Sequence, residues 1–276
     1  MAALLALGGA LSWGAGDFLG GLASRRIAVL TVLAVSQAIG LAGIALWIWF
    51  ADEPFPGMVE LLPAAAAGLA GISGLAALYR GLAVGAMGIV APISAASPVV
   101  PLGVDAARGT VPSALQWLGI GLVLTGIVTL SRESSGRGTQ RVAAGAGLAL
   151  LAALGFGAFI VGLDAGADES ATWAVAAARA TSVGAAVVVA MVLSTSLRPP
   201  MGLLPLLVGI GLFDTGANIL VALATTYGSA GVVAVLSAMY PIVTVVLARV
   251  VLGERLDASK RVGGVIALTG AVLVAS

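Results

Sequence analysis

The sequence predicts an all-α integral membrane protein with ten transmembrane helices arranged as two inverted five-helix repeats. The chain of 276 residues is 60% hydrophobic and only 9% charged, whereas soluble domains carry about 25% charged residues. Its mean hydropathy is +1.14, and apolar runs long enough to cross a hydrocarbon core of about 30 Å recur from end to end. These runs are continuous rather than alternating, which argues against a transmembrane β-barrel.

Charged or proline-rich breaks divide the chain into ten apolar runs, and each run is expected to form one membrane-spanning helix. The 39 glycines of the chain suit helices that pack closely through small residues. One stretch resembles a linker, the polar and central SRESSGRGTQR at 131–141. The predicted spans are residues 2–23, 29–50, 61–81, 87–106, 113–131, 142–163, 172–194, 203–225, 229–251 and 260–275.

An internal repeat indicates how the spans are organised. GAMGIVAPISAASPVV at 85–100 aligns without gaps with GSAGVVAVLSAMYPIV at 228–243, and 8 of the 16 positions are identical. The same offset of 143 residues aligns LSWGAG at 11–16 with LGFGAF at 154–159. A repeat that persists at one offset along the chain indicates a duplication.

The closing spans of the two halves follow the same pattern. LGIGLVLTGIV at 118–128 aligns with VGGVIALTGAV at 262–272, at an offset one residue longer. The predicted domains are therefore a five-helix repeat over 1–131, a linker over 132–141 and a second five-helix repeat over 142–276. Because five is odd, the second repeat enters the membrane from the opposite side, which is typical of secondary transporters.

The loop charges predict the orientation. If the N-terminus, the even-numbered loops and the C-terminus share one face, that face holds only one basic residue, Arg108. The other face holds 11 of the 13 basic residues, and Arg179 lies inside a span. The positive-inside rule then predicts a multi-pass protein of the cytoplasmic (inner) membrane with both termini outside.

Several stretches together resemble the EamA family of the drug/metabolite transporter superfamily. They are LSWG at 11–14, SAASPVVP at 94–101, SAMYPIVTVVLARVVLGERL at 237–256 and the glycine-rich closing spans. The resemblance covers essentially the whole chain and implies ten helices in two inverted halves that move small metabolites or drugs, often outward. The first half departs from the pattern, because DAARGTVP stands at 105–112 in place of GERL. The family is usually drawn with both termini in the cytoplasm, against the charge distribution.

Polar side chains at membrane depth are costly and mark functional sites by default. Asp17 lies well inside the first span, and Asp214 lies in the eighth with Asn218 one turn later on the same face. Arg179 lies inside the seventh span, and Gln37 occupies nearly the corresponding place in the second. We expect these groups to line a central cavity where a carboxylate binds a proton or a cationic group of the substrate. The alternative is that Arg179 pairs with one of the aspartates and only fixes helix packing.

The fourth and ninth spans carry matched polar stripes, whose spacing of i, i+3, i+4 and i+7 puts each set on one helix face. A proline inside a helix frees a carbonyl and bends the axis. We expect two bent, polar-faced helices that line the translocation path, the alternative being an ordinary helix–helix interface. The stripe residues are Ser94, Ser97, Pro98 and Pro101 in the fourth span, and Ser237, Tyr240, Pro241 and Thr244 in the ninth.

Two aromatic residues are further candidates for the cavity wall. Trp13 shares the face of Asp17 at helical spacing, and Tyr79 lies near the end of the third span. Either could stack on a cationic or aromatic substrate. Either could equally serve in packing or at the membrane interface.

The residue types restrict the chemistry. With no cysteine and no histidine, thiol nucleophiles and the commonest metal ligands are absent, so proton chemistry must use carboxylates. GAGD at 14–17 has the GxGD form that resembles the motif of intramembrane aspartyl proteases, with Asp214 as a possible second acid. In those proteases, however, GxGD follows the first aspartate, and their PAL motif is missing here.

The predicted function is secondary transport of a small organic metabolite or drug, such as an amine or amino acid, by alternating access with proton-coupled export. The alternatives are an intramembrane aspartyl protease that uses Asp17 and Asp214, or a non-transporting membrane partner. We expect no enzymatic activity, no metal, no cofactor and no nucleic-acid partner. The expected partners are the lipid bilayer, a small-molecule substrate and protons.

Overall fold

The chain folds into helices, which confirms the predicted all-α class. The computed structural model describes residues 1–24, 26–84, 93–94, 96–131, 139–252 and 258–275, and no strand occurs among them. The helices are α1 (Ala2–Ser24), α2 (Val29–Ala51), α3 (Leu62–Val84), α5 (Val99–Ala107), α6 (Ala114–Ser131), α7 (Thr139–Ala167), α8 (Ala171–Val192), the short 3₁₀ helix η1 (Met201–Leu203), α9 (Leu204–Thr225), α10 (Ala230–Ser237), α11 (Tyr240–Leu252) and α12 (Ala258–Ala275).

Local sequence explains where several helices begin. Ser113 and Gln116 form a reciprocal capping box at α6: the Ser113 N–H donates to Gln116 Oε1 over 3.0 Å, and the Gln116 N–H donates to Ser113 Oγ over 3.2 Å. Ser170 caps α8 by accepting from the Trp173 N–H at 3.2 Å. Such contacts satisfy N–H groups that have no partner within a helix.

The ninth predicted span is not one bent helix, which corrects the expectation from the sequence. It is divided into α10 and α11, with a break at Ala238 and Met239. Pro241 is the second residue of α11 rather than an interior residue of a longer helix. Proline lacks an N–H and its ring clashes with the carbonyl four residues earlier, so it is tolerated in a first turn and breaks a helix elsewhere. Pro98 likewise directly precedes α5.

Several of the predicted spans meet the requirements of a membrane crossing. Within the described part of the chain, five helices are long and apolar enough to cross a membrane. They are α1, α2, residues 147–167 of α7, α8, and residues 201–225 of η1 and α9. The apolar stretches of α3, α6, α10–α11 and α12 are shorter. Ten crossings therefore stay a prediction.

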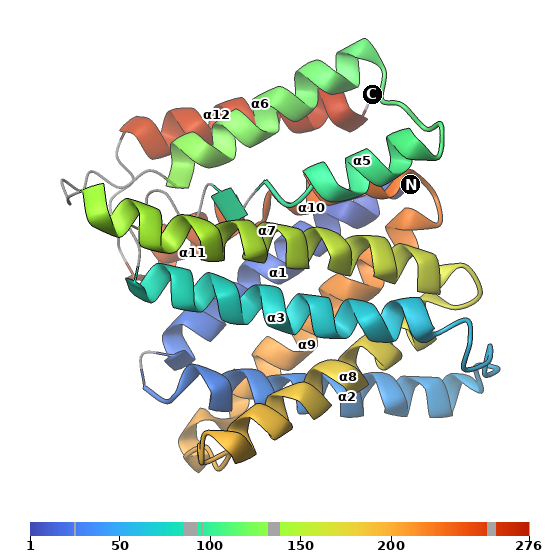
Figure 1. Cartoon of the computed structure of the whole chain (residues 1–276), viewed down its shortest axis with the longest axis vertical. Coiled ribbons are helices and arrows are strands. Elements are labelled where there is room, and N and C mark those ends of the chain that lie inside the picture. The colour runs from blue at the N-terminus through green and yellow to red at the C-terminus, as the bar shows by residue number, and fades with distance from the viewer. Residues whose placement is uncertain (25, 85–92, 95, 132–138, 253–257, 276) are drawn as a thin grey trace.

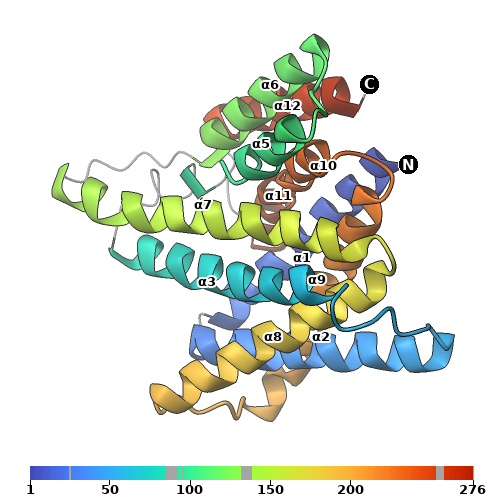
Figure 2. The same ribbon diagram turned by 45° about the vertical axis from the view of Figure 1, so that its right-hand side comes forward.

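The helices pack as a bundle with both termini at the same end (Figure 1). Figures 1 and 2 both show α6 beside α12 at one edge and α2 beside α8 near the other. Between these edges, α3 packs on α7 and α1 packs on α9. Helices of the first half thus pack mainly against helices of the second half, so neither half forms a separate compact body.

The contacts between the halves follow a two-fold pattern. A Cβ added at Gly14 of α1 would lie 2.7 Å from the Tyr240 carbonyl oxygen, and one added at Gly157 of α7 would lie 2.7 Å from the Ser97 carbonyl oxygen. Both residues of the second contact are related to those of the first by the offset of 143 residues found in the sequence. The duplicated sequence therefore makes duplicated contacts.

The pair α6 and α12 shows the same relationship. A Cβ at Gly119 would lie 2.7 Å from the Gly270 carbonyl oxygen, and one at Gly270 would lie 2.6 Å from the Gly119 carbonyl oxygen. Gly126 would in turn contact the Gly263 carbonyl oxygen at 2.6 Å. Only glycine allows two helix backbones to approach this closely, which explains why both closing spans are rich in glycine.

Candidate functional site

The intramembrane polar residues of α1 and α9 meet through the Trp13 indole. Its Nε1–H donates to Asp214 Oδ1 and to Asn218 Oδ1, both at 3.1 Å. Gly16 brings α1 close to α9 at this level, because a Cβ there would lie 3.6 Å from the Asp214 nitrogen. The predicted shared face of Asp214 and Asn218 is thus occupied by a residue from the other half of the chain.

Arg179 of α8 pairs with Asp214 and not with Asp17. Its Nη1 lies 2.6 Å from Asp214 Oδ2. The Arg179 side chain is 3% exposed and the Asp214 side chain is 30% exposed. A buried arginine requires such a partner, because removing an unpaired charge from water costs several kcal/mol. Asp214 therefore uses one oxygen for Arg179 and the other for Trp13.

Three buried side chains keep atoms without a hydrogen-bond partner among the residues that the structure describes. They are Gln37 of α2 at Oε1, Arg179 at Nε and Nη2, and Thr215 of α9 at Oγ1. Gly40 brings α2 against α9 here, since a Cβ added at Gly40 would overlap Thr215 Oγ1. Buried polar atoms are nearly always satisfied in proteins, so these three side chains are unusual.

Asp17 differs from Asp214 in its surroundings. Its side chain is exposed and makes no hydrogen bond or ion pair with the described part of the protein. A Cβ added at Gly20 or Gly21, one turn further along α1, would meet no atom within 4 Å. The described part of the protein therefore leaves the Asp17 side chain uncovered.

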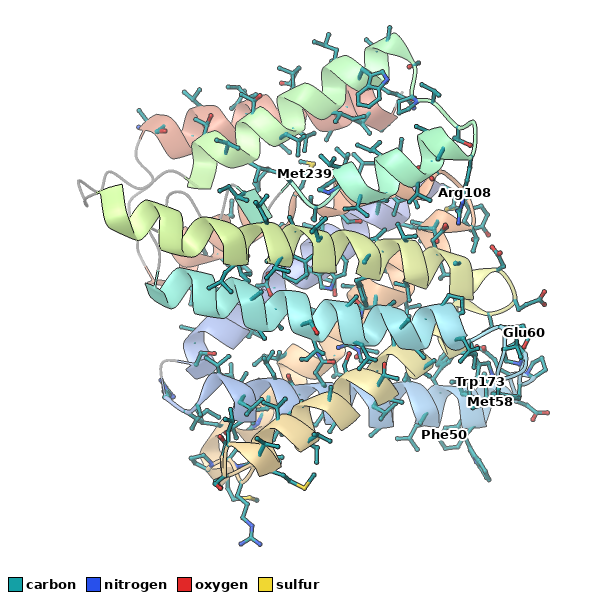
Figure 3. All side chains as sticks on the ribbon, in the orientation of Figure 1. Phe50, Met58, Glu60, Arg108, Trp173 and Met239 are labelled. Carbon is teal, nitrogen blue, oxygen red and sulfur yellow. The ribbon has the colours of Figure 1, made fainter. Side chains whose placement is uncertain are left out.

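A second polar region lies at the end of the bundle that carries the termini, where Figure 3 shows Arg108. A cavity of about 440 Å³ is lined there by residues that include Asp105, Arg108, Asp164 and Asp168. Arg108 Nη1 lies 3.3 Å from Asp164 Oδ2, and the Gly231 N–H donates to Asp105 Oδ2 over 2.6 Å. These two contacts join α5 of the first half to α7 and α10 of the second.

Comparison with known proteins agrees with this two-fold arrangement. A model of the EamA-like transporter family matches the chain twice, over residues 1–132 and over residues 143–276. The chain belongs to the EamA-like transporter family.

The solved structures place this EamA-like transporter in a known fold. One of those that match, titled "Crystal structure of protein", has a TM-score of 0.82 and 16% sequence identity. The match covers 99% of this chain and 95% of that one. At this identity the likeness concerns the fold alone. A search of curated proteins found no match.

The polar stripe of the ninth span partly contacts α1 in this EamA-like transporter. The Ser237 hydroxyl donates to the Ala6 carbonyl over 3.4 Å, and the Thr244 hydroxyl donates to the Gly14 carbonyl over 3.2 Å. Tyr240 lies edge-on to Trp13, with ring centroids 6.4 Å apart. Both hydroxyls thus lie in a helix–helix contact, which was the alternative to a role in the cavity wall.

The remaining stripe residues are less fully described. Ser94 and Pro98 are buried and Ser97 is half-buried at the start of α5. The side chains of Tyr79 and Pro241 lie outside the described part of the structure. Their roles as wall residues stay predictions.

The aspartyl-protease alternative gains no support from this geometry. Two catalytic aspartates would have to share a proton, whereas Asp214 is held by Arg179 and Trp13. The family to which the chain belongs consists of transporters. Sequence reasoning missed Thr215, because a threonine within an apolar helix is common at ordinary interfaces and gives no signal of its own.

Proposed function

We propose that this protein is a secondary transporter that moves a small organic metabolite or drug across the cytoplasmic membrane by alternating access. One helix bundle, with members from both repeats, would rock against another around a fixed site and open that site to one side at a time. Family membership and the two-fold contacts support this cycle. The contacts of Asp214 with Trp13 and Arg179 support it further, because they join α1 of the first repeat to α8 and α9 of the second.

The different surroundings of the two aspartates are the observation that carries the proposal. Asp214 is engaged by Arg179 and Trp13, while the exposed Asp17 has no such partner within the described residues. An unpaired carboxylate in a membrane-spanning helix needs water, a proton or a ligand cation. In the proposed mechanism Asp17 alternates between a proton and a cationic group of the substrate, and Asp214 holds the site in place.

The charges of Arg179, Asp17 and Asp214 indicate the kind of solute. One arginine and two aspartates leave one negative charge, which fits a cationic or zwitterionic metabolite such as an amine or an amino acid. Proton entry at Asp17 would then accompany export of the solute. The distribution of basic residues supports an orientation with both termini outside.

Proton movement on the purified protein tests this function. The wild type, Asp17→Asn and the control Asp168→Asn are placed in weak buffer with a pH-sensitive dye, and amines, amino acids and drugs are added one at a time. Asp168 is an exposed acid at the end of α7 and makes the matched charge change outside the span. We expect protons to be released by the wild type and by the control, and no release from Asp17→Asn.

Reconstitution in liposomes completes the test. We expect an imposed pH gradient to drive solute uptake by the wild type and the control but not by Asp17→Asn. Normal gradient-driven transport by Asp17→Asn would remove Asp17 from the mechanism. Failure of the wild type to move any solute would refute transport itself.

A further inference from the structure

A surface groove lies between the end of α1 and the start of α9, at the end of the bundle opposite the termini. Its volume is about 460 Å³. It is lined by Leu19, Leu22 and Arg26 from the end of α1, and by residues that include Gly202, Leu203 and Leu206 from η1 and α9. Arg26 is the one charged residue among the described residues that line it. The groove is therefore apolar with a single cation.

The groove is separate from the side of α1 that carries Asp17. An α-helix turns by about 100° per residue, so Leu19 and Leu22 lie roughly 200° and 140° around α1 from Asp17. Leu19 instead packs toward α9, because a Cβ added at Gly209 would lie 3.1 Å from Leu19 Cδ1. The groove is therefore distinct from the candidate site around Asp17.

The ends of the two helices place the groove at the boundary of the membrane. α1 ends at Ser24, and the apolar stretch of η1 and α9 begins at Met201. Arg26 therefore lies at the level where lipid headgroups meet the hydrocarbon. Leu22 and Leu19 lie roughly one and two helical turns deeper. The groove thus runs from a cationic rim into an apolar interior.

Arg26 is free to bind an anion from outside the described part of the protein. Its side chain is exposed, and neither ion pair among the described residues involves it. The cavity at the opposite end of the bundle differs, because Asp105, Asp164 and Asp168 line it beside Arg108. The charge of the groove is complementary to a phosphate group, which arginine binds through two parallel hydrogen bonds.

We propose that this groove binds an anionic phospholipid, with the phosphate at Arg26 and an acyl chain over Leu22 and Leu19. A lipid fits better than a soluble phosphate, because only a lipid joins the anion to a chain that gains free energy from burial against the apolar lining. Basic pockets between membrane helices bind anionic headgroups in this way. The lipid would contact α1 of the first repeat and α9 of the second, and so strengthen the contact between the halves at this end.

Two lipids that share their acyl chains and differ in headgroup charge test the phosphate contact. Dioleoylphosphatidylglycerol and dioleoylphosphatidylethanolamine are titrated into the full-length protein in detergent, and native mass spectrometry gives the Kd of the first bound lipid. We expect the wild type to bind the anionic lipid about fivefold more tightly, as for one arginine near a membrane surface. Arg26→Gln should bring this ratio close to one. Arg198→Gln, in an exposed loop at the same end that does not line the groove, should keep the wild-type ratio.

A second variant tests the apolar part of the groove. A Cβ added at Gly202 would meet no atom within 4 Å, so Gly202→Phe can fill the groove without a clash at its Cβ. We expect it to weaken the binding of both lipids severalfold. Gly184→Phe in α8 is the control, because Gly184 is also exposed and open at its Cβ but does not line the groove. It should bind both lipids as the wild type does.

The possible results decide between a lipid and other occupants. Equal binding of the two lipids by the wild type, or an unchanged ratio in Arg26→Gln, would overturn the proposal. Unchanged lipid binding by Gly202→Phe would show that the groove is not the site. Glycerophosphoglycerol, the headgroup without acyl chains, is the third probe, and binding as tight as that of the lipid would identify a site for soluble phosphates instead. None of these readouts uses transport, so this inference and the proposed function stand or fall separately.

Discussion

Arg179 and Asp214 form an ion pair that is buried on one side only. Their closest atoms are 2.6 Å apart, yet the arginine side chain is 3% exposed and the aspartate side chain 30%. The pair joins α8 to α9, and Trp13 extends it to α1 of the other half. The buried Arg179 charge therefore needs Asp214 as its partner. The Asp214 charge is partly exposed and depends less on Arg179.

Removal of Asp214 should consequently destabilise the fold. We expect Asp214→Ala to lower the free energy of unfolding by about 3–5 kcal/mol, because it leaves a buried charge without a partner. Replacing both members, with Arg179→Met and Asp214→Leu, should restore much of the loss. Denaturation in mixed detergent micelles measures these differences.

The pair formed by Arg108 and Asp164 provides the matched control. The Arg108 side chain is 54% exposed, and exposed ion pairs contribute about 0–1 kcal/mol. We therefore expect Asp164→Ala to change stability by less than about 1 kcal/mol. Equal losses in Asp164→Ala and Asp214→Ala would contradict the importance given to burial.

The two-fold contacts predict paired effects of glycine substitution. Gly14→Ala and Gly157→Ala should each lower stability by about 1–3 kcal/mol, because the added methyl group meets the backbone of the other half in both. Gly20→Ala, in the same helix as Gly14, meets no atom within 4 Å and should be neutral. Thermal unfolding in detergent measures all three, and a neutral effect at only one of the two contact positions would argue against equivalent packing.

The sequence predicted the helical class and the repeat because these depend on composition and on an offset between residues, which need no three-dimensional information. It also identified Asp214, Asn218 and Arg179 as polar groups at membrane depth, and Trp13 as an aromatic candidate for the cavity wall. It did not predict which aspartate forms the ion pair with Arg179, because the pairing depends on the packing of α8 on α9. The break before Pro241 was also missed: a proline signals a disturbed helix without deciding between a bend and a restart.

The contact between Asp105 and the first turn of α10 should restrain the end of the bundle that carries the termini. The Gly231 N–H donates to Asp105 Oδ2 over 2.6 Å, and Asp105 is 5% exposed. Asp105→Ala removes this link between the halves. We expect it to increase severalfold the rate at which a maleimide labels Ala234→Cys, a buried position in α10. Asp168→Ala, an exposed acid at the same end, should leave the rate unchanged, and equal rates in both variants would show that Asp105 does not hold the halves together.

The absence of cysteine from the chain makes its orientation directly testable. Val111, between α5 and α6, and Met201, between α8 and α9, are 64% and 79% exposed and lie at opposite ends of the bundle. Because the basic residues gather at the end of Met201, the positive-inside rule places that end in the cytoplasm. We expect a membrane-impermeant maleimide to label Val111→Cys in intact cells, and to label Met201→Cys only after the membrane is permeabilised. The reverse pattern would place both termini in the cytoplasm and show that the charge distribution does not set the orientation of this protein.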